Sequence, residues 1–281
     1  MQVKKCLICN SGNSEVVFAY NKPDIYEIAM SEDKAGYFRK WLRCKQCGFH
    51  YSVGSQSKQN LRKNYILTYR DKINSWRNAS PEETFQKTLA LPDKQSETKI
   101  RVQWIKKHIA EAWQSGMTKS THPPYLALDI GGGVGIFAYV FQDKYWKSYV
   151  IDPSKGCEFI KTSLNIPLKQ TFYRPRLFAR KFNFVSLVYV LEHIIDPIRL
   201  VRNIHKDIKK HSFLFLEVPD AISFRIKPSG DDIFNSTHLW MFDPKSLSLL
   251  LDRCGFEVIS LERLKTIRGH FAIMTLAAAK N

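Results

Sequence analysis

The sequence has no apolar run that approaches the roughly 18 residues of a transmembrane helix. Its first ten residues, MQVKKCLICN, also lack the apolar core of a signal peptide. We therefore expect a cytoplasmic protein with no membrane partner. Acidic residues are scarce: 26 Asp and Glu stand against 43 Lys and Arg, which gives a net charge of +17. This excess suits an anionic partner, either nucleic acid or a small molecule, and an ordinary solvated basic surface is the alternative.

Cysteine is sparse, and its spacing is not that of a secreted disulfide framework. Four of the six cysteines form two CxxC pairs: Cys6, Cys9, Cys44 and Cys47. Four thiolates in two such pairs suit a tetrahedral zinc ion. Asn10 and Gly48 follow the pairs and tolerate the left-handed backbone that turns N–H groups toward the sulfur atoms. We therefore predict structural Zn²⁺ in a zinc-ribbon module over residues 1–52, with four unmetallated or redox-active thiols as the alternative.

A glycine-rich turn lies in the middle of the chain. The strand-like run 125–129 leads through Ile130 to Gly131, Gly133 and Gly135, and a helix-like apolar run follows at once. Because glycine tolerates φ > 0 and has no side chain, such a turn lets the backbone approach a nucleotide-like ligand. A dinucleotide fingerprint would place its third glycine one residue later, where this chain has isoleucine. The spacing therefore argues against a dinucleotide site.

A second acid lies farther along the chain. Asp152 ends the strand-like run 148–152, about 20 residues after the glycine turn, where an acid can bond a ribose diol. Beyond it, strand-like and helix-like segments alternate, which predicts a parallel sheet. A helix is expected over 155–164, and the run 219–241 is predicted to be an irregular insert. The last two strand-like runs are close enough in sequence for a hairpin.

The order of acid and glycines resembles the first motif of class I S-adenosylmethionine-dependent methyltransferases. The run 184–197, FVSLVYVLEHIIDP, is similar to their fourth-strand motif, in the VLEH form of small-molecule and sugar-pathway enzymes. The run 237–258 resembles the C-terminal stretch of the same subgroup. The resemblance implies an α/β, Rossmann-like sheet of seven strands, the last antiparallel. We expect this domain over 123–281, preceded by a linker and helical extension over 53–122.

The resemblance also implies where the cofactor S-adenosyl-L-methionine binds. The glycine turn faces its methionine part, Asp152 its ribose, and the residues after the fourth strand lie across from them. The cofactor-binding residues expected on this basis are Asp129, Ile130, Gly131, Gly132, Gly133, Gly135, Asp152, Pro153, Leu191 and Glu192. The family's usual acid for the adenine amine has no counterpart, so Gln170 or a backbone carbonyl takes that role. Asn183 stands where the family commonly has Asp.

Two histidines are candidate catalytic bases. His193 follows the fourth strand, and His238 lies in the insert expected to roof the acceptor. A histidine suits proton removal from a hydroxyl or carbon acid because its pKa is close to neutrality. An orienting or structural role is the alternative for each of them.

The leading hypothesis is an enzyme that methylates a small molecule, and the resemblance favours a nucleotide-linked sugar or surface-glycan precursor. An RNA methyltransferase is the alternative enzyme, because a zinc ribbon and a basic chain also suit RNA. A third possibility is a non-catalytic binding module with the methyltransferase fold. Salt-dependent RNA binding would distinguish the second hypothesis, and absence of cofactor binding the third.

Overall fold

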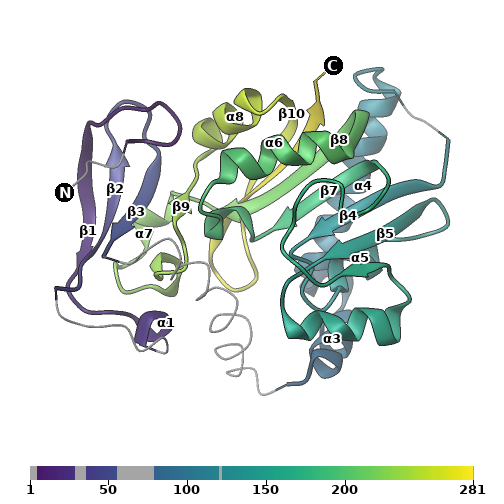
Figure 1. Cartoon of the computed structure of the whole chain (residues 1–281), viewed down its shortest axis with the longest axis horizontal. Helices are drawn as coiled ribbons and strands as arrows, with labels where there is room; N and C mark the ends of the chain where they lie inside the picture. Colours follow the sequence, from purple (N-terminus) through teal and green to yellow (C-terminus); the bar gives the residue numbers. More distant parts are fainter. Residues whose placement is uncertain (1–4, 29–35, 56–78, 120–121, 281) are drawn as a thin grey trace.

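The computed structural model describes residues 5–28, 36–55, 79–119 and 122–280. The predicted extension over 53–122 therefore lies partly outside the described residues, at 56–78 and 120–121. Within the described part, no helix combines the length and apolarity needed to cross a bilayer. The chain forms a large seven-stranded sheet and a smaller four-stranded one, which lie side by side in Figure 1.

The seven-stranded sheet has the order β10-β11-β8-β7-β4-β5-β6. In that order its strands are Phe256–Lys265, Phe271–Ala279, Ile208–Pro219, Phe182–Val188, Tyr125–Ile130, Trp146–Ile151 and Leu168–Lys169. The pairs from β8 to β6 are parallel, whereas β11 runs antiparallel to both β8 and β10. The predicted seven-stranded α/β sheet with an antiparallel last strand is therefore confirmed, and the two final strands form the expected hairpin.

Helices cover both faces of this sheet because its central strands are buried on both sides. Along β8, Phe213 and Phe215 pack with α4 (Glu97–Gln114), whereas the alternate residues Leu214 and Leu216 pack with α6 (Pro197–Asp207) and α8 (Pro244–Arg253). Figure 1 shows α6 and α8 crossing one face. Burying each such side chain contributes about 1.5–3 kcal/mol. The main helices are α3 (Pro81–Leu89), α4 (Glu97–Gln114), α5 (Ile136–Phe141), α6 (Pro197–Asp207) and α8 (Pro244–Arg253).

The helix ends follow local sequence signals. Asp196 accepts the N–H of Arg199 and caps α6, and Asp243 with Ser246 forms a capping box on α8. The predicted helix over 155–164 is confirmed in its position, but it is not a regular α-helix. A 3₁₀ turn at Lys155–Cys157 continues through 158–159 into a π turn at Ile160–Leu164.

The four-stranded sheet has the order β1-β2-β3-β9. Its strands are β1 (Ser14–Tyr20), β2 (Arg39–Cys44), β3 (His50–Gly54) and β9 (Trp240–Met241). The first three come from the N-terminal region, where the short helix α1 (Ile25–Ile28) also lies, and β3 crosses the predicted boundary after residue 52. Strand β9 comes from the predicted irregular insert, which also contains helix α7 (Ser223–Ile226). The small sheet is thus completed by a strand about 190 residues away in sequence.

Aromatic packing explains this pairing. The ring of Phe49 stacks on Trp240, with 6.0 Å between the centroids, and lies 5.2 Å from the ring of Phe242. All three side chains are at most 4% exposed. Burial of these rings gives β9 a large apolar contact, although it is only two residues long. The insert is therefore anchored to the N-terminal sheet.

Candidate functional site

The glycine turn has the backbone that its sequence predicts. The φ angles of Gly131, Gly133 and Gly135 are 81°, 57° and 82°. A Cβ on Gly131 would lie 2.5 Å from Val190 Cγ2, and one on Gly135 would lie 2.7 Å from Ile160 Cγ1. Glycine is thus required both by the dihedral angles and by close packing. The turn joins β4 directly to α5 at the carboxyl edge of the sheet.

Asp152 lies at the end of β5, beside this turn. Its carboxylate accepts the N–H of Gly133 at 2.8 Å and that of Ser154 at 2.8 Å, and the side chain is fully buried. Asp129 is the last but one residue of β4, and its carboxylate accepts a hydrogen bond from the hydroxyl of Ser186 at 2.8 Å. The two predicted acids therefore belong to one edge of the sheet, and Asp152 connects the loops after β4 and β5. A carboxylate beside the glycine turn, at the carboxyl edge of the sheet, is the kind of acceptor that a ribose diol requires.

The other predicted cofactor residues differ in how deeply they are buried. Ile130 and Leu191 are buried core residues with at most 4% exposure, so only their backbone can face a ligand. Gly132 packs close to Asp129, because a Cβ there would lie 2.8 Å from its Oδ2. Pro153 is half-buried in the loop directly after Asp152.

Gln170 and Asn183, the two departures from the family pattern, lie at different edges of the sheet. Gln170 lies after β6 and donates its Nε2–H to the carbonyl of Ser154 at 3.2 Å, so it borders the same loop as Asp152. Asn183 lies near the start of β7, at the opposite edge, and accepts the N–H of Leu126 at 3.0 Å. Its replacement of Asp therefore does not touch the cofactor edge.

The two candidate bases lie together. The ring centroids of His193 and His238 are 4.9 Å apart, and both residues are less than 9% exposed. His193 Nδ1 lies 2.9 Å from the carbonyl of Thr237, and His238 Nδ1 lies 2.7 Å from that of Ile233. Because a carbonyl only accepts, each Nδ1 carries a proton, and in the neutral form of each ring the lone pair is on Nε2.

Glu192 completes this cluster. It is fully buried, and its Oε1 lies 3.8 Å from His193 Nε2. Burial raises the pKa of Glu192 to about 8, and burial lowers the pKa of His238 below its ordinary value. Glu192 and His238 therefore favour their uncharged forms near neutral pH. We refer to Glu192, His193 and His238 as the Glu-His-His cluster.

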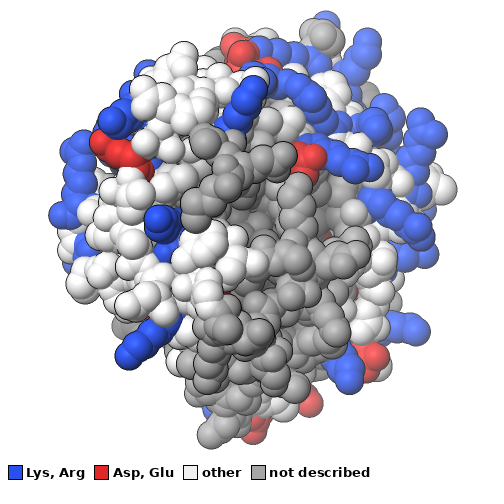
Figure 2. All heavy atoms as spheres, turned by 60° about the vertical axis from the view of Figure 1, so that its left-hand side comes forward, with Lys and Arg blue, Asp and Glu red and all other residues white. Residues whose placement is uncertain are grey.

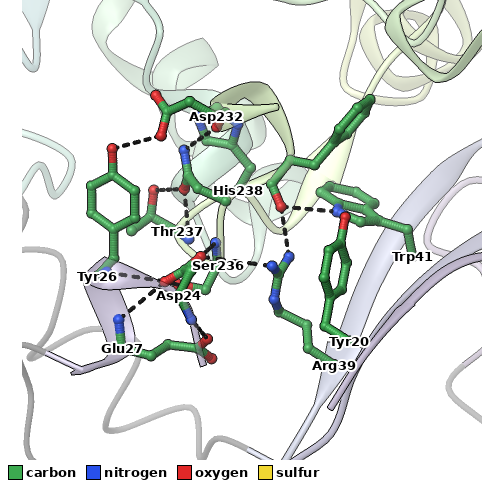
Figure 3. Close-up of polar contacts among 12 residues, drawn as sticks. Tyr20, Asp24, Tyr26, Glu27, Arg39, Trp41, Asp232, Ser236, Thr237 and His238 are labelled. Carbon is green, nitrogen blue, oxygen red and sulfur yellow. Dashed lines mark hydrogen bonds and ion pairs between the residues drawn. The ribbon is translucent and has the colours of Figure 1, made fainter. Parts of the chain in front are cut away.

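Contacts from the N-terminal region hold the insert that carries His238 (Figure 3). Asp24 accepts both the backbone N–H and the hydroxyl of Ser236, at 2.6 and 2.8 Å. Arg39 is 5% exposed and donates to the carbonyl of Phe234 at 2.6 Å. Asp24 and Arg39 were not among the residues predicted from the sequence, and no local pattern marks them, since Asp24 is recognisable only as a cap for its own short helix.

The four paired cysteines also come together. Cys6 Sγ lies 3.5 Å from Cys47 Sγ, and Cys9 Sγ lies 3.4 Å from Cys44 Sγ. All four sulfur atoms lie within 4.8 Å of one another. Tetrahedral zinc with Zn–S bonds of about 2.3 Å separates its sulfurs by about 3.8 Å, so the spacing suits this ion. Asn10 and Gly48 have φ of 62° and 79°, as the ribbon pattern predicts.

Basic side chains are distributed over the surface. On the face shown in Figure 2, Lys and Arg border the upper and right-hand rim, and acidic residues are few. This agrees with the net charge of +17.

Comparisons with known proteins agree with the topology. A family model described as a methyltransferase domain matches residues 101–261, more than half of the chain. No curated protein matches the sequence. The magnesium protoporphyrin IX methyltransferase of Synechocystis PCC 6803, solved with bound SAH, superposes with a TM-score of 0.52 at 14% identity, covering 80% of this chain and 100% of that one.

The same Synechocystis enzyme with bound SAM gives a TM-score of 0.51 at 13% identity, covering 80% of this chain and 99% of the other. A glycopeptide N-methyltransferase complexed with S-adenosyl-L-homocysteine has a TM-score of 0.44 at 14% identity, covering 61% of this chain and 86% of that one. The family match and the seven-stranded topology lead to one conclusion. The chain belongs to the methyltransferase domain family and is an S-adenosylmethionine-dependent class I methyltransferase.

Proposed function

We propose that the protein methylates a small-molecule acceptor, with a nucleotide-linked sugar or surface-glycan precursor as the acceptor class. The observation that carries the proposal is the convergence of two buried imidazoles, His193 and His238. His193 follows β7 three residues after Val190, whose side chain packs against Gly131 of the glycine turn. A proton acceptor beside the cofactor loop is what methylation of a hydroxyl or a carbon acid uses.

The residues that would hold S-adenosylmethionine come from the carboxyl ends of three neighbouring strands. The cofactor supplies an electrophilic sulfonium methyl, so the protein mainly has to align it with a nucleophile in a dry pocket. The glycine turn would face the methionine part, and the Asp152 carboxylate would bond the ribose hydroxyls. The proposed binding set is Asp129, Ile130, Gly131, Gly132, Gly133, Gly135, Asp152, Pro153, Leu191 and Glu192.

Proton removal from the acceptor is assigned to the Nε2 atoms of His193 and His238. Their Nδ1–H groups are engaged by the carbonyls of Thr237 and Ile233, so each ring has a defined tautomer with its basic atom on the other side. Burial lowers the pKa of His238, which keeps its ring neutral and able to take a proton near pH 7. This role is supported by geometry as well as by residue type.

The acceptor class is supported by the VLEH motif and by the excess of basic residues. An RNA acceptor is the second candidate, favoured by the same net charge and by the cysteine module. Transfer of labelled methyl groups from S-adenosylmethionine to nucleotide-sugar pools, compared with total RNA, tests the choice. Label in RNA together with strongly salt-dependent RNA binding would replace the small-molecule proposal. A protein that binds no cofactor at all would instead be a binding module.

We also infer that the four paired cysteines hold one structural Zn²⁺. The inference is supported by four sulfur atoms within 4.8 Å of one another at the end of β2 and in the flanking loops. A tetrahedral site closed by four thiolates leaves no open position for chemistry. The ion would therefore stabilise the N-terminal sheet, to which β9 and the insert are attached.

Replacement of Asp152 by alanine is expected to weaken S-adenosylmethionine binding by about 1.5–3 kcal/mol, the value of a lost hydrogen bond to a charged group. Calorimetric titration of the full-length protein measures this change. Asp143→Ala is the matched control, because Asp143 also accepts backbone N–H groups before β5 but lies at its amino end. Equal cofactor affinity in Asp152→Ala and the parent would remove Asp152 from the binding set.

Replacement of Asp24 by alanine should release the insert at Ser236. We expect the free energy of unfolding to fall by up to about 3–6 kcal/mol, because two hydrogen bonds to a charged acceptor are lost. Turnover should fall more than cofactor affinity, since His238 lies two residues farther along. Glu15→Ala is the control, because the exposed Glu15–Arg43 ion pair contributes only about 0–1 kcal/mol. An Asp24→Ala variant whose free energy of unfolding, measured by denaturant melts, and whose kcat are both unchanged would refute the coupling between Asp24 and the insert.

A further inference from the structure

The Glu-His-His cluster has a feature that proton transfer alone does not explain. One ligand atom from each of its three residues lies within 4.8 Å of the other two. We propose that Glu192, His193 and His238 bind a divalent transition-metal ion at a site separate from the four cysteines. The proposal goes beyond the proposed function, because binding of the ion does not require methyl transfer.

The two histidines are oriented as metal ligands commonly are. A ligating imidazole almost always donates its other N–H to a carbonyl or carboxylate, which fixes the tautomer and the ring plane. Here the carbonyls of Thr237 and Ile233 occupy that place, at 2.9 and 2.7 Å from the Nδ1 atoms. With Nδ1 bonded to a carbonyl, each imidazole would bind an ion through Nε2, and the His193 Nε2 lies 3.8 Å from Glu192 Oε1.

The Glu192 carboxyl group is the independent sign of a ligand. It is fully buried, and neither of its oxygen atoms has a hydrogen-bond partner within the described part of the chain. Such a group is costly, because buried polar atoms in native proteins are nearly always paired. A cation bound between the carboxylate and two imidazoles would compensate this cost directly.

The donor set indicates the class of ion. Two imidazole nitrogens and one carboxylate oxygen suit Zn²⁺, Fe²⁺ or Co²⁺, whereas Mg²⁺ and Ca²⁺ prefer oxygen ligands alone. Three protein ligands also leave a coordination position for water or for an acceptor oxygen. In the ion-loaded protein the Nε2 atoms are ligands, so the ion rather than an imidazole would make an acceptor hydroxyl more acidic.

A cobalt titration tests the site without any methyl acceptor. Full-length protein that retains zinc in its cysteine site is treated with a mild chelator and then titrated with Co²⁺. We expect saturation at one Co²⁺ per chain, with weak d–d bands and no thiolate-to-cobalt charge-transfer band. Glu192→Gln and His238→Gln should each weaken binding by at least about 10–100-fold, the loss seen when only an outer partner of a ligand is removed.

His108→Gln is the matched control. His108 Nδ1 also lies 2.8 Å from a carbonyl and its Nε2 lies 3.9 Å from Glu111, but within the described residues it belongs to no three-ligand group. Cobalt-edge X-ray absorption of the unsubstituted protein decides the question even if a variant fails to fold, because imidazole and sulfur neighbours scatter differently. The proposal would be overturned if cobalt binding does not saturate, if X-ray absorption shows sulfur ligands only, or if the folded variants bind Co²⁺ with unchanged affinity. If the protein transfers no methyl group, the expected stoichiometry of one Co²⁺ per chain is unaffected. The proposed function and the proposed ion site can therefore fail independently.

Discussion

Alanine in place of His193 or His238 is expected to lower turnover by about 10²–10⁴-fold, the usual contribution of a positioned general base. Cofactor affinity should remain close to that of the parent, because the proposed cofactor set contains neither imidazole. The loss should therefore fall on kcat. The physical reason is that both imidazoles lie in one buried cluster, with His193 just after β7, the strand that pairs with β4 of the glycine turn, so bulk water cannot replace them.

The measurement is single-turnover methyl transfer with an accepted substrate, together with calorimetry of cofactor binding. His108→Ala controls for removal of a half-buried histidine elsewhere in the fold. Because His238 also bonds Ile233, a thermal melt must show that the His238 variant is folded at the assay temperature. Parental turnover in both folded variants would mean that methyl transfer here depends on proximity alone.

Replacement of Cys44 by serine is expected to remove the zinc ion and unfold the N-terminal sheet. Metal content should fall from about one ion per chain to nearly zero, because metal affinity in a four-thiolate site is largely folding free energy. Cys44 lies at the end of β2, which pairs with β3, and β3 pairs with β9 of the insert. Turnover should fall as well. Leu239 accepts the N–H of Ser52 in β3 and directly follows His238 in the chain, so loss of the sheet would also disturb His238.

Metal analysis by mass spectrometry and circular dichroism of the full-length protein measure these effects. Cys254→Ser is the control, because Cys254 is a buried cysteine distant from the other four in sequence and donates to the carbonyl of Ile198. It should retain zinc and the N-terminal sheet. A parent protein purified in reducing buffer without zinc, or a Cys44→Ser variant with full zinc content, would contradict the zinc inference.

Local features of the site were predictable from the sequence because they depend on dihedral angles and on neighbouring residues. The positive φ at Gly131, Gly133 and Gly135 requires glycine, and the chain has glycine at each of these positions. The cap at Asp196 follows from a side-chain oxygen placed just before a helix. The irregular turns within 155–164 show the limit, since helical spacing of apolar residues does not distinguish 3₁₀ and π turns from a regular helix.

The assembly of the site depended on contacts between distant parts of the chain. Asp24 and Ser236 are 212 residues apart, and Arg39 and Phe234 are 195 apart, yet both pairs hold the insert. Neither pair has a periodicity or motif that marks it. Their contact follows only from the pairing of β9 with β3, which in turn depends on burial of aromatic rings between the two regions.

The sequence by itself determined the family, the glycine turn with its two acids, and the pairing of the cysteines, because each is written in short runs of residues whose chemistry and spacing are local. Only the tertiary structure decided that His193 and His238 share one buried cluster with Glu192, and that the N-terminal sheet holds the insert. The physical reason is that burial and sheet register are properties of the packed chain. They bring together side chains 45 to 212 residues apart, which no local pattern can specify.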